Sequence, residues 1–272
     1  MGADTKALRN RIKSVDSTLH LTRAMGLVAS SKMRRAMEGM THGREYERAV
    51  CGVIEPLLDS PECRKSPYMR TQCEGGRHCL VVIAGDRGLA GGYNANIFRA
   101  LRDMEEAEII PIGKRACDRF GEQSVYAEKF DYDHALGLAI ELCRGFREGK
   151  YDRVDILGTH YVSMLSQEPC VRAVLPLRAD ETKKTDLPVA RAVFEPDELT
   201  VLEAAVPEYV AGVLMSAVRE SFACEIAARR TAMDSAGKNA QQMIDTLQLE
   251  YNRARQGAIT QEITEIVAGS GT

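Results

Sequence analysis

The sequence predicts an α/β protein: a long antiparallel coiled coil of N- and C-terminal helices, with a compact α/β domain between them. Three observations lead to this prediction. A heptad pattern runs along the first helix, strands alternate with helices in the middle of the chain, and residues 207–268 are rich in strong helix formers with no proline after Pro207. The predicted segments are the N-terminal coiled-coil helix at 1–59, the α/β domain at 78–195 and the C-terminal coiled-coil helix at 196–272.

The N-terminal helix is predicted over residues 5–58 by ten positions that recur in steps of four and three, eight of them apolar. The positions are Leu8, Ile12, Val15, Leu19, Thr22, Gly26, Ala29, Met33, Ala36 and Met40. This is the heptad pattern of a left-handed coiled coil, whose length and unbroken spacing favour it over an amphipathic helix on a globular core. The small residues Thr22, Gly26 and Ala29 predict a close approach of the partner helix. The Ser60-Pro61 pair ends the helix.

A glycine-rich turn follows the first predicted strand. A polar loop at 60–78 precedes the apolar run 80–84, which ends in Gly85-Asp86-Arg87-Gly88-Leu89-Ala90-Gly91-Gly92, and a helix begins near Asn94. Strand, glycine-rich turn and helix in this order are typical of nucleotide sites, but both G-x-G-x-x-G and Gly-Lys-Ser/Thr are missing. We interpret the stretch as a turn that needs positive φ or close backbone approach.

The middle of the chain continues as alternating strands and helices. Strands are predicted at 108–112, 124–127, 153–157 (extending to 162), 171–177 and 193–194, and helices at 113–120 and 133–147. This alternation predicts a mainly parallel sheet covered on both faces. The acidic segment 195–198 predicts the start of the last helix.

The C-terminal helix is too long for its own protein. Residues 207–268 would extend about 90 Å at 1.5 Å per residue. This helix is longer than its N-terminal partner, so its end is expected to project beyond that partner. The projecting end carries Ile259, Ile263 and Ile266, which we expect another protein to cover. The isolated chain is therefore expected to aggregate.

Charge is spread unevenly along the chain. Residues 1–48 carry ten Lys or Arg and five acids, a net charge of +5, which leaves −8 on the remainder of a chain whose total is −3. Such asymmetry indicates an acidic partner surface. Nucleic acid is not the expected partner, because acids of the C-terminal helix would offset the basic helix. We see no apolar run of about 18 residues and no secretory signal, which favours a cytosol-like compartment.

No stretch supplies a catalytic constellation. Walker A, H-E-x-x-H and G-x-S-x-G motifs are missing, so we expect no catalytic residue, no cofactor and no metal. Eight cysteines without a C-x-x-C pair are interpreted as free thiols. Cys63, Cys73, His78 and Cys79 lack the close, paired spacing of a zinc site. The sequence therefore points to a mechanical or scaffolding protein.

Three motifs resemble the family of F-type ATP synthase γ subunits, in a bacterial-like form. They are Arg9-Asn10-Arg11-Ile12-Lys13-Ser14-Val15 with Thr22-Arg23-Ala24-Met25 and Val28-Ala29-Ser30-Ser31-Lys32-Met33; then Asp86-Arg87-Gly88-Leu89-Ala90-Gly91-Gly92; then Glu250-Tyr251-Asn252-Arg253-Ala254-Arg255-Gln256, running on to Ile259-Thr260-Gln261-Glu262-Ile263-Thr264-Glu265-Ile266. The resemblance covers the whole chain, and the C-terminal motif is the most specific.

The resemblance implies a Rossmann-like α/β domain at the foot of a rotating central stalk. It implies three α and three β subunits around the stalk, a membrane ring of c subunits below it and an ε subunit beside it. The chain would be a non-catalytic subunit, peripheral at the cytoplasmic face of the cell membrane. It would couple proton or sodium flow to ATP synthesis or hydrolysis.

By the same resemblance, eight residues are expected to contact the α and β subunits: Arg23, Met25, Arg255, Gln256, Thr260, Gln261, Glu262 and Glu265. Asp86, Arg87, Gly88 and Tyr209 are the candidates for contacts with the c-ring and ε. A solvated helix face is the alternative interpretation of the eight residues assigned to the α and β subunits. Two other functions remain open, a coiled-coil scaffold or adaptor and a nucleotide-binding enzyme that uses residues 85–92.

Overall fold

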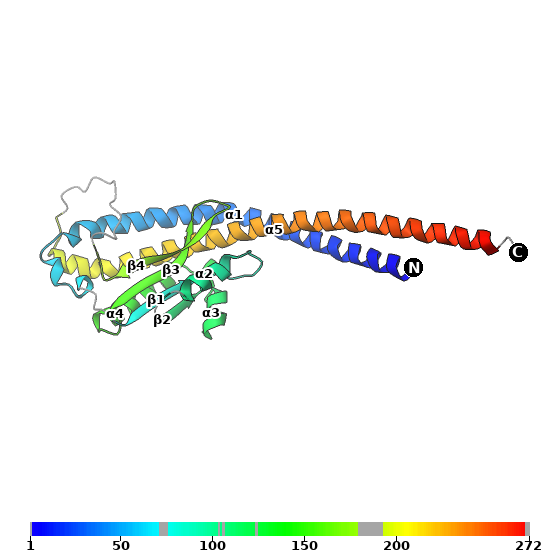
Figure 1. Ribbon diagram of the computed structural model, residues 1–272. Helices are drawn as coiled ribbons and strands as arrows, with labels where there is room; N and C mark the ends of the chain where they lie inside the picture. Colours follow the sequence, from blue (N-terminus) through cyan, green and yellow to red (C-terminus); the bar gives the residue numbers. More distant parts are fainter. Residues whose placement is uncertain are drawn as a thin grey trace. The chain divides into compact units, whose positions relative to one another are not determined.

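The computed structural model describes residues 2–70, 76–102, 104, 107–122, 125–178 and 193–269. Along the chain, a long helix comes first, an α/β segment follows, and a second long helix comes last. The helices are α1 (Gly2–Leu58), α2 (Tyr93–Arg102), α3 (Lys114–Phe120), α4 (Tyr132–Arg147) and α5 (Glu198–Gly269). The strands are β1 (His78–Ile83), β2 (Glu108–Ile112), β3 (Arg153–Tyr161) and β4 (Gln167–Leu175). Short 3₁₀ helices occupy Cys63–Lys65, Pro67–Met69 and Ala127–Lys129 (Figure 1).

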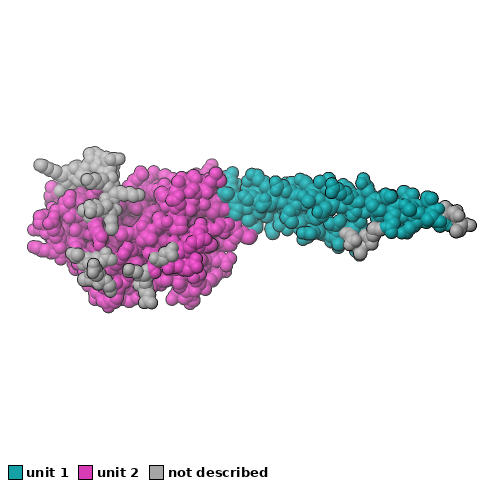
Figure 2. Space-filling model, in the orientation of Figure 1, with its two compact units in different colours: residues 1–31, 229–272 teal, residues 32–228 magenta. Residues whose placement is uncertain are grey.

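The chain forms two compact units, each of which takes part of α1 and part of α5. Unit 1 comprises residues 1–31 and 229–272, and unit 2 comprises residues 32–228 (Figure 2). The long helices predicted at both ends are confirmed by α1 and α5. The ranges 1–59, 78–195 and 196–272 follow the chain rather than these units, and their standing as domains stays a prediction.

Unit 1 is an antiparallel helix pair. A Cβ on Gly26 would lie 3.7 Å from the Met233 Cβ, and one on Gly237 would lie 3.6 Å from the Thr22 hydroxyl oxygen. From Thr22 to Gly26 the chain advances four residues along α1, while their partners on α5 go back four residues, from Gly237 to Met233. The two helices therefore run antiparallel. Leu19 packs with Ala240 and Ile244 in the apolar interior of this pair. The small residues at the centre of the heptad pattern therefore permit the close helix approach that the sequence predicts.

The sheet of unit 2 has the strand order β2-β1-β3-β4. β1 pairs parallel with β2 and β3, so the mainly parallel sheet is confirmed. β4 runs antiparallel to β3, since the five residues 162–166 between them are too few for a crossover connection. The strands predicted at 124–127 and 193–194 are wrong for the described residues of those ranges: Ala127 begins a 3₁₀ helix, and 193–194 is irregular.

Both faces of the sheet are buried. Val81 and Ile156 point into an apolar core shared with α4 and with the unit 2 parts of α1 and α5. Leu80 and Leu157 point the other way, into a core shared with α2 and α3. The strands therefore have continuous apolar runs, as expected for a sheet covered on two sides (Figure 1).

The parts of α1 and α5 in unit 2 also pack closely. A Cβ on Gly43 would lie 3.2 Å from the Ser216 Cα, so the two backbones almost touch. α5 begins where the acidic segment predicts, because the Asp197 carboxylate accepts the Thr200 N–H at 2.8 Å. Pro207 lies inside α5 and does not end it.

α5 is more apolar than the sequence-based expectation. By length and composition this helix contains an 18-residue stretch apolar enough to cross a membrane, which corrects the expectation that no such run exists. In the structure 61% of that stretch is buried. The core helix of a folded domain has the same property, so the stretch is weak evidence for a membrane span.

Candidate functional site

The C-terminal end of α5 holds the longest run of consecutive exposed residues in the described chain. Extending the pairing of Gly26 with Met233 and of Thr22 with Gly237 places the start of α1 opposite Gly257. Every residue from 259 to 269 is exposed, in agreement with this register. Ile259, Ile263 and Ile266 are 47%, 56% and 70% exposed. The apolar projecting end that the sequence predicts is therefore present, and we call residues 259–269 the α5 end.

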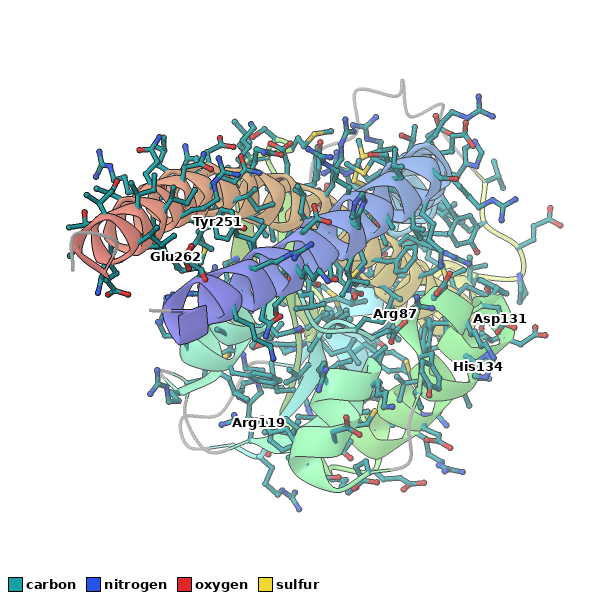
Figure 3. The ribbon with its side chains drawn as sticks, turned by 90° about the vertical axis from the view of Figure 1, so that its right-hand side faces the viewer. Arg87, Arg119, Asp131, His134, Tyr251 and Glu262 are labelled. Atoms are coloured by element: carbon teal, nitrogen blue, oxygen red, sulfur yellow. The ribbon has the colours of Figure 1, made fainter. Side chains whose placement is uncertain are left out.

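The predicted contact residues near the C-terminus all lie at or just before the α5 end. Arg255, Gln256, Thr260, Gln261, Glu262 and Glu265 are exposed, and Figure 3 labels Glu262 together with Tyr251 on the same helix. The Gln261 side-chain amide donates to the Glu265 carboxylate at 2.9 Å, and the Thr260 hydroxyl donates to the Gln256 carbonyl at 2.9 Å. These are bonds between residues four apart on one helix, which leave the outer surface available. The role of these residues toward other subunits stays a prediction.

Arg23 and Met25 lie at a different level of the helix pair. The Arg23 guanidinium donates to the Gln241 side-chain carbonyl at 3.2 Å, and Met25 is half-buried. Gln241 precedes Arg255 by 14 residues, or about 21 Å of helix at 1.5 Å per residue. The structure thus separates the eight predicted contact residues into two groups.

Sequence reasoning missed three exposed apolar side chains beside Arg23 and Met25. Leu21, Leu27 and Val28 are 59%, 73% and 55% exposed on α1. All three fall outside the heptad positions. An apolar residue outside the buried stripe of a coiled coil faces away from the partner helix, so the heptad pattern itself could have identified these exposed side chains.

The glycine-rich turn is filled by carboxylates of the chain itself. Asp86 is buried, and its carboxylate accepts the N–H groups of Ala127 at 2.8 Å, Glu128 at 2.8 Å and Lys114 at 3.2 Å. The N–H groups of Asp86 and Arg87 donate to the two oxygens of Glu225, each at 3.1 Å. Two of the amides that would hold a phosphate are therefore already occupied, which argues against a nucleotide site at 85–92.

The turn also has the backbone that the sequence analysis expected. Leu89 and Gly91 adopt φ of 60° and 57°, in the left-handed region. The side-chain oxygen of Asn94 accepts the Gly85 N–H at 2.8 Å and so ties the end of β1 to the start of α2. The Arg87 side chain is exposed (labelled in Figure 3) and lies 3.6 Å from the Glu128 carboxylate.

Two of the four candidates for c-ring and ε contacts are buried. Tyr209 packs in the apolar core of unit 2, and Asp86 is buried within the glycine-rich turn. Gly88 is half-buried and Arg87 is exposed. Their contacts with other subunits stay predictions, and the geometry leaves Arg87 as the side chain with the most open surface.

A buried carboxylate on α5 joins three elements of unit 2. The Glu220 side chain is fully buried and accepts hydrogen bonds from the Arg44 guanidinium at 2.6 Å and the Tyr161 N–H at 2.9 Å. The Arg172 guanidinium also donates to it, and His160 Nδ1 lies 2.8 Å away. Burial by itself would raise the pKa of Glu220, but the Tyr161 N–H and the Arg172 and Arg44 guanidinium groups outweigh it and lower the pKa.

The cysteines of the described chain are free thiols. Burial raises the pKa of Cys79 and of Cys143 to about 12, which suppresses the reactive thiolate. Cys73, part of the cluster considered for zinc, lies outside the described residues. Among the residues that the structure does describe, no group of three His, Cys, Asp or Glu side chains is arranged to hold a metal ion.

These features define a class of protein: a chain with an antiparallel pair of long terminal helices and a Rossmann-like α/β domain, whose longest run of exposed residues in the described chain lies at a helix end. A family model described as ATP synthase matches residues 4–272. The chain is 38% identical to the ATP synthase gamma chain of Ruminococcus albus over 98% of both chains. It is 35% identical to the sodium ion specific gamma chain of Acetobacterium woodii over 99% of both.

Solved structures agree in fold. The rotor of the Euglena gracilis mitochondrial ATP synthase aligns with a TM-score of 0.66 at 18% identity, over 95% of this chain and 100% of that one. A chain of the Tetrahymena thermophila central stalk and c-ring structure aligns with a TM-score of 0.61 at 22% identity, over 79% and 99%. The chain belongs to the family of ATP synthase gamma chains, which confirms the resemblance. It is a central-stalk rotor subunit of a membrane-associated ATP synthase.

Proposed function

We propose that the chain transmits rotation to the catalytic α and β subunits through the α5 end. One observation carries the proposal: residues 259–269 remain helical although every one of them is exposed, with three isoleucines among them. Exposed apolar side chains on a regular helix fit a surface that is covered in an assembly. The Tetrahymena structure, described as a central stalk with its c-ring, is in keeping with such an assembly.

The proposed mechanism depends on asymmetry. A single helix end presents different side chains in different directions, so three β subunits around it would meet three different surfaces. Each contact stabilises one β conformation over another, and rotation shifts these populations in turn. Gln261 and Glu262 would contact β at the α5 end, with Arg255, Gln256, Thr260 and Glu265. Arg23 and Met25 would form a second level of contact.

The α/β domain would form the foot of the stalk. We propose that the exposed Arg87 side chain contacts the c-ring or ε, while Asp86, Gly88 and Tyr209 hold that surface in place. The complex would have three α and three β subunits, one ε and a membrane c-ring, with this chain peripheral at the cytoplasmic face of the cell membrane. The ion would be a proton or sodium.

Co-purification tests this proposal against a scaffold or adaptor function. Nucleotide-binding subunits should co-purify with the chain in the three-to-three-to-one ratio that the family implies. Replacing Gln261 and Glu262 together by Ala should lower coupled ATPase and synthesis with assembly intact. The matched control replaces Arg34 and Glu38, an exposed ion pair four residues apart on α1, by Ala. Unchanged rates in an assembled Gln261/Glu262 variant would overturn the assigned contacts.

A further inference from the structure

One face of α5 in unit 2 carries buried polar side chains, which is unusual for a core helix. We call Ser216, Glu220, Ser221 and Glu225 the α5 polar cluster; each is essentially inaccessible to solvent. Their spacing of four, one and four residues places them on one side of the helix. Buried polar groups are costly unless they are hydrogen-bonded, so their partners matter.

The partners lie where the central parallel strands end. The Ser221 hydroxyl accepts the Thr159 N–H at 3.1 Å, and Glu220 accepts the Tyr161 N–H at 2.9 Å; both amides are in the last part of β3. Glu225 accepts the two amides that follow β1, as described above. The Tyr93 hydroxyl at the start of α2 donates to the Ser221 carbonyl at 2.9 Å.

This edge of an open α/β sheet is where such folds usually bind ligands. In unit 2 the carboxylates of Glu220 and Glu225 occupy it instead. The α/β domain is thus bound to α5 through directional, charge-assisted hydrogen bonds in addition to apolar packing.

We propose that the α5 polar cluster is the joint that passes torque between the α/β domain and α5, with Glu225 its principal positioning residue. This inference rests on the proposed rotary function. Apolar contact is non-directional, so it resists rotation of a helix about its own axis weakly. Hydrogen bonds resist such rotation strongly, because they weaken steeply when their geometry changes.

The geometry sets the scale of this resistance. Turning α5 by about 10° moves an atom about 5.5 Å from its axis by about 1 Å. The two bonds to Glu225 are already 3.1 Å long, so a shift of that size breaks them when the buried carboxylate turns with the helix. The joint therefore holds α5 against small rotations relative to the sheet.

Two variants weaken the joint at Glu225 in different ways. Glu225→Gln keeps the side-chain shape but has one acceptor oxygen, so one of the two amides faces an NH₂ group. Gly85→Ala keeps every charge, but the new Cβ would lie 2.9 Å from the Glu225 Cδ and displace the carboxylate. Because that atom is the far end of a flexible side chain, the fold can adjust. Glu38→Gln, at an exposed carboxylate on the unit 2 part of α1, is the matched control.

Load distinguishes a torque joint from a structural contact. In the detached complex without load, both variants should hydrolyse ATP within about 20% of wild type. In vesicles matched for subunit content, the ion gradient that ATP hydrolysis sustains should fall at least about threefold. Gradients equal to wild type would overturn the inference, as would a parallel loss of both activities with the amount of assembled complex. Failure of the wild-type chain to support any ATP-driven pumping would instead refute the rotary function itself.

Discussion

The exposed isoleucines of the α5 end give the sharpest quantitative prediction. Replacing Ile259, Ile263 and Ile266 together by Ala should weaken association with the α and β subunits. Each replacement removes three carbons, or about 2.4 kcal/mol at about 0.8 kcal/mol per buried methylene if a fully exposed side chain becomes fully buried. The exposed fractions of 47%, 56% and 70% correspond to about 1.7 fully exposed side chains in total.

The expected loss is therefore about 4 kcal/mol if the partner covers all of this surface and about 2 kcal/mol if it covers half. At about 1.4 kcal/mol per tenfold change, the Kd should rise between about thirtyfold and a thousandfold. Ala is the strongest helix former, so the α5 end should stay helical and the loss should reflect contact alone. The isolated variant should also aggregate less than the wild-type chain.

The assay is titration of the labelled chain with assembled α and β subunits at fixed salt. Leu165→Ala is the control, because Leu165 is highly exposed but lies in the β3–β4 turn, far along the chain from the α5 end. A Kd of the triple variant within about threefold of wild type would refute the reasoning that partner subunits bury these side chains.

Three further predictions concern unit 2. Glu220→Ala should cost about 3 kcal/mol of unfolding free energy, measured by urea denaturation, because it leaves the half-buried Arg44 and Arg172 guanidinium groups without their shared, fully buried carboxylate; a loss under about 1 kcal/mol would contradict this. Because folding lowers the pKa of Glu220, this carboxylate should stabilise the fold at pH values above its ordinary pKa of 4.5. The stabilisation should be lost as the pH falls through the lower pKa of the folded state. Glu220→Gln should therefore flatten the acidic part of the pH–stability curve. Gly113→Ala should prevent soluble folding, because at φ 89° its Cβ would lie 2.0 Å from the Ala84 carbonyl oxygen. Gly121→Ala, at φ 74° with open space around it, should cost only about 1–2 kcal/mol of unfolding free energy, measured by thermal unfolding. Similar melting temperatures for the two variants would refute the steric argument.

Regular patterns made the helices and the parallel core predictable. Leu19, Ala29 and Met33 are buried as the heptad positions require, because a helix pair repeats the same contact every few residues. The direction of β4 was harder, since an apolar run predicts a strand without stating its orientation. The exposed α5 end could be predicted by comparing the lengths of the two long helices. The separation of the predicted contact residues into two levels could not, because it depends on the register between α1 and α5.

The carboxylates in the glycine-rich turn could not be predicted from local sequence. Glu225 lies 139 residues from Asp86 along the chain, and no periodicity links them. Strand, glycine-rich turn and helix describe the backbone equally well whether its amides hold a phosphate or a carboxylate of the same chain. Only the tertiary structure shows which anion is present, so the missing glycine spacing was a correct but indirect argument against a nucleotide.

The unequal lengths of the two long helices connect stability to function. α5 has 72 residues and α1 has 57, so part of α5 must lack the helix partner that stabilises the rest. A separate peptide of eleven residues would be a marginal helix in water, because nucleation is costly. Residues 259–269 avoid that cost, because they continue a helix already formed by residues packed against α1. The chain can therefore present a helical end with exposed isoleucines, and we expect this end to gain its full stability only when other subunits surround it.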